Sequence, residues 1–373
     1  MRVTAVIKSL GPGGAEQLLV EFARCAPQVN IDLRVVSLLA QKRHLVGALE
    51  AAGAKVHCIG VNGLSEFRWV RELVADIRSS RPDVLHTHSP ALAPFVRLAA
   101  HAGALGRPRP VLATTEHNVW TSYRRPTRVA NRLTAALDDL AVTVSDEVRR
   151  SLPTRRIRER ATVVHHGIDL AGVRASADRR SASRASLGLA DDDIVVATVA
   201  NYRTQKNYPN LLAAASAASA VLPNLRFIAV GQGPLQSVVE AEHRRLGLGD
   251  RMMLLGMRTD VPDVLAAADV FALASDYEGL PVALMEAMAL GLPVVATAVG
   301  GVAEVVGPDV GRLVPPRDAP ALAAAIVAVC SDANLRQRLG DGSRAASATF
   351  DAVTTAKALT DLFEGALARR RRR

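Results

Sequence analysis

Short apolar runs and amphipathic stretches alternate along most of the chain, and this alternation predicts a series of strands and helices. The run Val3–Leu10 is short and rich in β-branched residues, as in a buried strand. Apolar positions with helical spacing follow it over Ala15–Ala26. The same alternation starts again at Ile194–Ala200. Strands and helices that alternate at this spacing form parallel, doubly wound sheets, so we expect an α/β protein with two such sheets.

One segment interrupts the pattern and predicts a domain boundary. Residues 170–193 are rich in Ala, Ser, Asp and Arg and contain few large apolar side chains. With 373 residues, the chain is long enough for two domains that each bury their own core. We expect one domain over residues 1–172 and a second over 173–350. The sequence GRLVPPRD, which begins at Gly311, is interpreted as a turn.

The stretch Ser275–Gly301 carries the most informative chemistry. Pro281 suits the first position of a helix, Gly291 suits its end, and LPVVAT after it is typical of a buried strand. Glu286 is the only polar side chain between Pro281 and Leu290, so the helix is expected to be buried all round. A buried carboxylate needs hydrogen-bond donors, and an acceptor-only group suits a pair of sugar hydroxyls.

Glu278 lies just before this helix, near its free N–H groups. Such groups favour anions, including a phosphate. Glu278 and Glu286 therefore flank a candidate phosphate site. The alternative is that Glu286 is an ordinary helix former and Glu278 a loop charge, which the lack of any other polar residue on the helix disfavours.

This stretch resembles the Glu-x7-Glu signature of the retaining glycosyltransferases of family 4. The resemblance implies the GT-B fold, in which two Rossmann-like domains face each other across a cleft. It implies further that a C-terminal helix, here within 351–373, returns to join the first domain. It also implies that Glu286 holds the ribose of a nucleotide and that Glu278 holds hydroxyls of the donor sugar. Gly279 and Leu280, at the helix start, would then contact the diphosphate.

Three further segments fit the resemblance. A Gly-rich turn after the first strand would face the donor phosphates through Gly14, although a simple strand–helix turn would look similar. The loop after Ala200 carries Arg203 and Lys206, which suit a diphosphate; the alternative is a solvated basic loop. In the family, the loop matching Met257 and Arg258 holds the base by backbone groups.

Histidines occur at the predicted carboxyl ends of strands, where doubly wound sheets bind ligands. His86 and His88 could bind a metal, but no third ligand stands out, so we expect no metal site. The resemblance gives His117 a contact near the donor sugar; the alternative is a structural histidine. His166 stands where the family often has Asn.

Composition and charge restrict the partners. Only 3% of the residues are aromatic, which argues against nucleic-acid binding by base stacking. Three widely spaced cysteines fit neither a zinc site nor a disulfide framework, and no leader or membrane-spanning run is recognised, so we expect a cytoplasmic protein. Residues 1–170 contain 24 Lys and Arg against 15 Asp and Glu, a net charge of +9 out of +10 for the chain. This asymmetry suggests an anionic partner, and Arg125, Arg128 and Arg132 share one face of a predicted helix that could contact an anionic membrane.

The function implied is transfer of a sugar from a nucleotide-diphosphate donor to a glycan or lipid-linked acceptor, with retention of configuration and no metal or other cofactor. Residues expected to take part in the reaction are His117, Arg203, Lys206 and Glu278. Two alternatives remain open: a nucleotide-sugar 2-epimerase of the same fold, and a non-enzymatic protein that binds sugar nucleotides.

Overall fold

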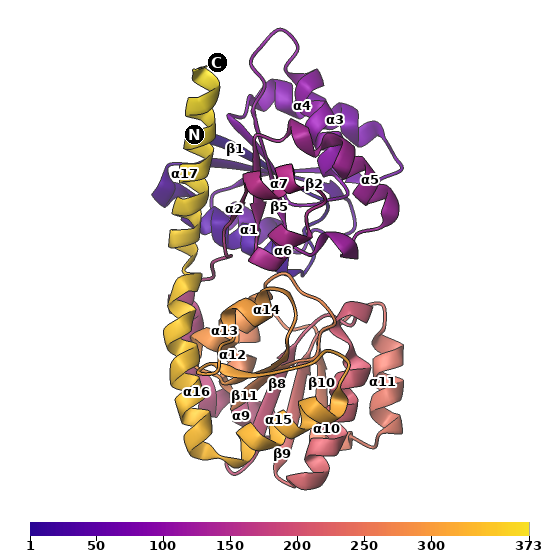
Figure 1. Cartoon of the computed structure of the whole chain (residues 1–373), viewed down its shortest axis with the longest axis vertical. Coiled ribbons are helices and arrows are strands. Elements are labelled where there is room, and N and C mark those ends of the chain that lie inside the picture. Colours follow the sequence, from indigo (N-terminus) through magenta and orange to yellow (C-terminus); the bar gives the residue numbers. More distant parts are fainter. Residues whose placement is uncertain (373) are drawn as a thin grey trace. The chain divides into compact units, whose positions relative to one another are not determined.

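A computed structural model describes residues 1–372 and divides the chain into two compact units (Figure 1). The first unit comprises Met1–Ile168 and the C-terminal segment from Asp351, and the second comprises Asp169–Phe350. The sequence placed the division after residue 172, and the structure places it after Ile168. Residue 373, the end of the expected C-terminal helix, lies outside the described residues.

The first unit is built on a seven-stranded parallel sheet with the strand order β3-β2-β1-β4-β5-β6-β7. Its strands are β1 Arg2–Ile7, β2 Asp32–Leu39, β3 Lys55–Val61, β4 Val84–Thr87, β5 Val111–Glu116, β6 Leu140–Thr143 and β7 Ala161–Val163. Its α-helices are α1 Gly14–Cys25, α2 Val46–Ala51, α3 Arg68–Ser80, α4 Ala93–Gly103, α5 Arg125–Thr134, α6 Asp146–Ser151, α7 Arg155–Arg160 and α17 Ala352–Arg371.

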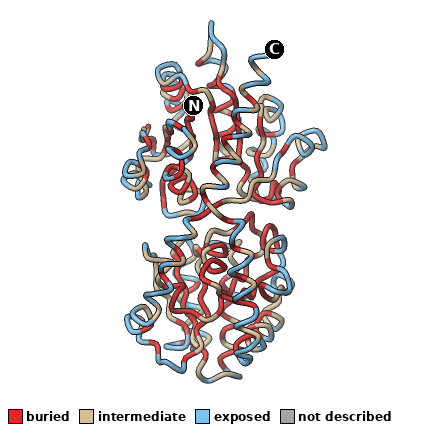
Figure 2. Tube along the Cα trace, turned by 90° about the vertical axis from the view of Figure 1, so that its left-hand side faces the viewer, coloured by how far each residue is buried: buried red, intermediate tan, exposed pale blue. Residues whose placement is uncertain are grey.

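Both faces of this sheet are covered, which explains why its strands are apolar on both sides. Side chains of a strand alternate between the two faces. In β1, Val3, Ala5 and Ile7 belong to one apolar cluster with residues of α1 and α17, whereas Val6 belongs to a second cluster with residues of α3 and α4. Figure 2 shows the buried residues concentrated in the interior of each unit.

The last helix, α17, packs on the first unit, as the resemblance implied (Figure 1). Phe363 is fully buried in the same cluster as the β1 side chains. A parallel β-bridge joins Ile168 to Asp351 at the start of the helix, and Thr355 Oγ1 donates a hydrogen bond to the His165 carbonyl at 3.1 Å. The end of the chain therefore completes the core of the first unit.

The second unit contains a six-stranded parallel sheet with the order β10-β9-β8-β11-β12-β13, the same relative order as the first six strands of the other unit. Its strands are β8 Ile194–Val199, β9 Leu225–Val230, β10 Met252–Gly256, β11 Val270–Leu273, β12 Val294–Thr297 and β13 Gly311–Val314. Its α-helices are α8 Leu170–Ala175, α9 Arg180–Ser186, α10 Tyr208–Val221, α11 Gln236–Arg245, α12 Val261–Ala266, α13 Val282–Ala289, α14 Gly300–Val305, α15 Ala319–Ser331 and α16 Ala333–Ala346.

One local prediction was wrong. Residues 311–314 form the edge strand β13, not a turn, because they extend the sheet beside β12. The segment 170–193, which was predicted to mark the domain boundary, directly follows the division after Ile168 and contains α8 and α9. Arg180 and Arg184 on α9 donate hydrogen bonds to the carbonyls of Ala266 and Ala267 at the end of α12, so arginines replace apolar side chains in docking this helix.

A buried arginine fixes α5 to α4 in the first unit. Arg97, 2% exposed, forms a bidentate pair with Asp138, at 2.7 and 2.9 Å, and also donates to Asn131 and Thr134. A weaker contact to Thr114, at 3.4 Å, occupies its fifth N–H. All five donors of the guanidinium are thereby satisfied, as burial of this charge requires.

Candidate functional site

In the second unit, the strand order brings the ends of β8 and β11 together. These strands are adjacent, although about 75 residues separate them in sequence, and the chain leaves them in opposite directions across the sheet. In open parallel sheets, ligands bind at such a switch point, beyond the carboxyl ends of the strands. The loops that follow the two strands hold most of the predicted donor-binding residues of this unit.

Lys206 and Glu278 meet at this point. Lys206 Nζ lies 2.5 Å from Glu278 Oε1, and the Ser275 hydroxyl donates to the same oxygen at 2.6 Å. Glu278 is 4% exposed, and the Lys206 side chain is mostly buried. The sequence predicted both residues as ligands but did not predict their ion pair. A buried carboxylate requires such donors, and here it has two.

A second carboxylate holds the two loops together. Asp276 Oδ1 accepts from Asn207 Nδ2 at 2.8 Å, and Oδ2 accepts from Arg317 Nη2 at 2.8 Å. The Asp276 N–H donates to the Gln205 carbonyl at 2.8 Å. Sequence reasoning missed this residue, although its place between Ser275 and Glu278 was a signal that it belongs to the same loop.

Gly300 and Gly301, which follow β12, pack against the turn before α13 and fix its backbone. Gly301 N–H donates to the Gly279 carbonyl at 2.6 Å. Gly300 has φ +52°, and a Cβ there would lie 2.0 Å from the Glu278 carbonyl, so only glycine fits. This clamp fixes the backbone of Glu278, Gly279 and Leu280 at the helix N-terminus.

Helix α13 agrees with its prediction except at its start. Pro281 is the N-cap residue and not the first helical residue, and Gly291 at φ +78° follows the helix as expected. Most of its side chains are buried, whereas Glu286 is half-buried. A carboxylate that remains partly accessible on an apolar helix can still reach a ligand.

Arg203, Met257 and Arg258 lie closer to solvent. Arg203 is exposed. Its charge acts on the neighbouring Tyr277: burial and the carboxylates of Glu278 and Asp276 raise the pKa of this tyrosine, and the positive charge of Arg203 partly offsets that rise. Arg258 is paired with Asp260 at 2.5 Å. Met257 is 45% exposed. The roles predicted for these residues in donor binding stay predictions.

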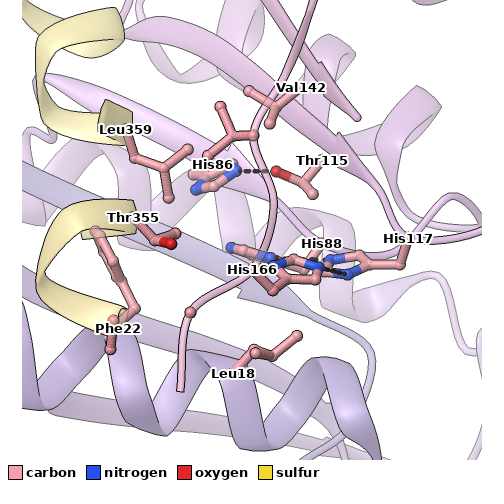
Figure 3. A pocket seen from close by; sticks show the side chains of 13 residues that line it. Leu18, Phe22, His86, His88, Thr115, His117, Val142, His166, Thr355 and Leu359 are labelled. Carbon is pink, nitrogen blue, oxygen red and sulfur yellow. Dashed lines mark hydrogen bonds between the residues drawn. The ribbon is translucent and has the colours of Figure 1, made fainter. Parts of the chain in front are cut away.

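In the first unit, four histidines gather at the carboxyl ends of β4, β5 and β7 (Figure 3). His117 Nδ1 lies 3.0 Å from His166 Nε2, and His117 Nε2 lies 3.3 Å from His88 Nδ1. His86 bonds the Thr115 hydroxyl at 2.7 Å, and its ring centroid is 4.1 Å from that of His88. The sequence singled out these positions separately, and the fold joins them in one cluster.

The cluster lines a cavity of about 40 Å³, which is room for about one water molecule. Apolar side chains of α1 and α17 form its other walls, including Leu18, Phe22 and Leu359 (Figure 3). Burial lowers the pKa of His86 to about 3 and that of His117 to about 4. Burial and the neighbouring rings also hold the pKa values of His88 and His166 well below the usual range. All four rings are therefore neutral near pH 7.

The four rings are not arranged as metal ligands. The two nitrogens of His117 face different histidines on opposite sides of its ring, so the three rings form a row and do not converge on one point. Over residues 1–372, no group of three or more His, Cys, Asp or Glu side chains is placed to hold a metal ion.

The N-terminus of α1, where Gly14 was expected to face a phosphate, already has a carboxylate near it. A Cβ on Gly13 would lie 2.3 Å from Glu16 Oε2, and the Ser9 hydroxyl lies 3.5 Å from Glu16 Oε1. A carboxylate in the first turn satisfies the helix dipole. Contact between Gly14 and a phosphate thus stays a prediction.

A buried acid that sequence reasoning missed precedes His117. Burial raises the pKa of Glu116 to about 7. The Tyr123 hydroxyl lies 2.8 Å from Glu116 Oε2 and 3.0 Å from the Asn118 carbonyl. The hydroxyl is the donor in both contacts, so the two acceptors share its single proton; this bond opposes the effect of burial on the Glu116 pKa without cancelling it.

The face of α5 that was expected to be basic is only partly so. Arg125 and Arg132 are exposed, whereas Arg128 has its Nε buried without a hydrogen-bond partner among residues 1–372. Val129 is 58% exposed and Leu133 is 77% exposed, so apolar side chains accompany the two cations. Within residues 1–372, no single helix is long and apolar enough to cross a membrane; one pair, Ala319–Ser331 with Ala333–Phe350, passes by length and composition only, with a bend of 101°.

Comparisons with known proteins cover both units. The family model described as Glycosyltransferase Family 4 matches residues 12–171, and the model described as Glycosyl transferases group 1 matches residues 179–346.

Two curated relatives carry specific names. The UDP-Gal:alpha-D-GlcNAc-diphosphoundecaprenol alpha-1,3-galactosyltransferase of Escherichia coli is 26% identical over 258 residues, which is 65% of each chain. The GDP-mannose-dependent monoacylated alpha-(1-6)-phosphatidylinositol monomannoside mannosyltransferase of Corynebacterium glutamicum is 28% identical over 269 residues, which is 68% of this chain and 69% of the relative.

A solved structure shares the fold. Anabaena Alr3699/HepE in complex with UDP-glucose superposes with a TM-score of 0.85 at 24% identity, over 98% of this chain and all of the other.

Proposed function

The chain belongs to glycosyltransferase family 4 and has the GT-B fold, and from this we propose that it transfers a sugar from a nucleotide-diphosphate donor with retention of configuration at the anomeric carbon. The observation that carries the proposal is the buried pair of Lys206 and Glu278 at the switch point of the second sheet. The two relatives named above act with UDP-Gal and GDP-mannose, which supports a nucleotide-sugar donor without deciding the base.

The geometry of this pair suits the transfer. An ammonium has three N–H donors, so Lys206 can hold Glu278 and a diphosphate oxygen together. Both bonds to Glu278 are made by Oε1, so Oε2 can accept a hydroxyl of the sugar. The clamped backbone at Gly279 and Leu280 presents the N-terminus of α13, which favours a phosphate.

We propose that these groups make a divalent metal unnecessary. As the bond to the sugar breaks, negative charge develops on the leaving diphosphate. Lys206 and the helix N-terminus are already in place for that charge, and Arg203 can reach it from the solvent side. Glu286, half-buried on α13, would hold the ribose, and the backbone at Met257 and Arg258 would hold the base.

For the acceptor, we propose a glycan or a lipid-linked sugar, handled at a membrane surface. The names of both relatives include lipid-linked acceptors. In this chain, Arg125 and Arg132 on α5 supply positive charge beside exposed Val129 and Leu133, a combination that suits an anionic leaflet. The three cysteines are free thiols, which fits a cytoplasmic enzyme at the inner face.

A thermal-shift panel tests the donor. UDP-, GDP-, ADP- and dTDP-sugars are added one at a time, and a ligand at about 100 times its dissociation constant should add roughly 2.7 kcal/mol to the stability. One base should give a clear shift, and no shift with any of the four would count against the proposal.

Incubation with the selected nucleotide sugar and no acceptor then separates transfer from epimerisation. A transferase leaves the sugar configuration unchanged, and a 2-epimerase converts it. Conversion of the sugar without an acceptor would favour the epimerase.

A further inference from the structure

His117 lies in the middle of a hydrogen-bonded row of three imidazoles. Its Nδ1 is 3.0 Å from His166 Nε2, and its Nε2 is 3.3 Å from His88 Nδ1 (Figure 3). The rings of His117 and His166 are nearly parallel, with an angle of 15° between their planes. Neither nitrogen of His117 is therefore free while both bonds hold.

Because these rings are neutral near pH 7, their protons are not independent. A neutral imidazole has one N–H and one bare nitrogen, so each contact in the row needs a donor on one side and an acceptor on the other. Only two arrangements satisfy both contacts: all rings donate toward His166, or all donate toward His88. The tautomer of His117 is thus set by its neighbours.

The two contacts of His117 differ in strength and in surroundings. The bond to His166 is the shorter, and the bond to His88, at 3.3 Å, is near the long limit for nitrogen donors. At the His88 end, Nε2 is buried and has no hydrogen-bond partner among the described residues, and His88 lines the cavity beside α1 and α17. The hydrogen bond at the His166 end of the row is therefore the stronger one, and His88 is left with one long bond and one unpartnered nitrogen among the described residues.

We propose that His166 is a positioning residue for the transfer reaction: it holds His117 by Nδ1, so that the opposite nitrogen, Nε2, is presented to a hydroxyl of the sugar substrate. The hydroxyl takes the place of the long contact to His88. This inference rests on the proposed function, in which His117 contacts the substrate, and it adds the residue that orients the ring. The next residue, Gly167, lets the backbone beside His166 pack closely against α17, because a Cβ on Gly167 would lie only 2.5 Å from Ala352 Cα.

Two substitutions at one position provide the test. The side-chain amide of Gln reaches as far as Nε2 of a histidine, whereas that of Asn reaches only as far as Nδ1. Since His166 bonds through Nε2, His166→Gln should keep the contact and His166→Asn should lose it. The exposed His101, which bonds the carbonyl of Arg97 in its own helix, provides the control His101→Asn.

Steady-state kinetics with the selected nucleotide sugar give the first readout. His166→Asn should lower kcat by roughly ten- to hundredfold, as for a misplaced catalytic group, and change the donor KM by less than about threefold. His166→Gln and His101→Asn should stay within about threefold of the parent in both parameters. Equal loss in the Gln and Asn variants, or full activity in His166→Asn, would overturn the proposal.

Nitrogen-15 NMR of the His117 ring gives the second readout, which does not depend on activity. A single neutral tautomer is expected in the parent and in His166→Gln, and a mixture of tautomers in His166→Asn. An unchanged His117 spectrum in His166→Asn would overturn the positioning role. If the parent itself shows no transfer, the proposed function fails, and the spectrum still decides whether His166 orients His117.

Discussion

The carboxylate of Glu278 shows what a single residue gains from the fold. The sequence predicted that Glu278 and Lys206 bind different parts of one donor, from a motif and from a basic loop. It could not predict that they touch, because the contact depends on β8 and β11 being neighbours in the sheet. Ser275 bonds the Glu278 carboxylate, and Asp276 bonds Asn207 in the loop that carries Lys206. Neither residue belongs to a recognised motif, and sequence reasoning missed both for that reason.

Lys206→Met should reduce the transfer rate by about 10²–10³-fold, since it removes a preorganised charge from the leaving diphosphate. Thermal unfolding is measured alongside, because the substitution leaves Glu278 without its buried partner. Arg244→Met, at an exposed cation of the same unit, is the matched control and should leave the rate unchanged.

Chelator should have little effect on the transfer rate of the parent, because the proposed mechanism uses no metal ion. Activity that disappears in chelator and returns with Mg²⁺ or Mn²⁺ would refute metal independence.

Glu116 gives a prediction about pH. Its pKa is raised from 4.5 to about 7 by burial, so between these values the folded chain holds a proton that the unfolded chain has released. Stability from this group is complete below pH 4.5 and is lost as the pH rises through about 7. At about 1.4 kcal/mol per pKa unit, the loss is at most about 3.5 kcal/mol.

Glu116→Gln removes this titration. The unfolding free energy of the variant minus that of the parent, from denaturant melts at pH 4.5 and pH 8, should therefore increase with pH. The histidines titrate in both proteins and cancel in this difference. A difference that does not change with pH would show that Glu116 is ionised in the fold.

At the scale of elements, periodicity located most strands and helices, and their ends were the weak point. Helix α13 was recognised because its apolar surface, its single carboxylate and the glycine after it all agree. The edge strand β13 was mistaken for a turn because its four residues are followed by two prolines, and only pairing with β12 defines it. Helix α9 contains no large apolar side chain, and arginine–carbonyl hydrogen bonds dock it instead.

Helix α5 carries a prediction of its own. The chain should sediment with anionic vesicles and not with neutral ones, and salt should weaken the binding. Replacing Arg125 and Arg132 together by Ser should weaken it roughly thirtyfold, at about 1 kcal/mol for each cation. Replacing Val129 and Leu133 by Ser should also weaken it, because their exposed side chains would enter the leaflet.

The control for this experiment is Arg244→Ser with Arg338→Ser, two exposed cations of the second unit. If the control lost as much vesicle binding as the Arg125 and Arg132 variant, the binding would depend on the net charge of the chain and not on α5. Binding that is absent, or that ignores the α5 substitutions, would leave an enzyme with a soluble acceptor.

At the scale of the whole molecule, βα alternation and chain length predicted two doubly wound sheets, because they allow few other arrangements. The return of the last helix to the first unit was implied only by the family resemblance. The candidate site was predicted wherever one segment contains it, as in Ser275–Gly301. The row of His88, His117 and His166 was not predicted as a unit, because its members lie on three strand ends that only the sheet order brings together. The donor base and the acceptor depend on a few contacts that the fold does not fix.

Calorimetric titration with the bare nucleoside diphosphate of the preferred donor tests the central claim most directly. If the second unit binds the nucleotide as proposed, Glu286→Ala should weaken the affinity by roughly ten- to hundredfold, the cost of losing a charged hydrogen-bond partner of about 1.5–3 kcal/mol. Glu278→Gln should keep the affinity within about threefold and lower kcat, because its carboxylate serves the sugar. Equal nucleotide affinity in Glu286→Ala and the parent would contradict the account.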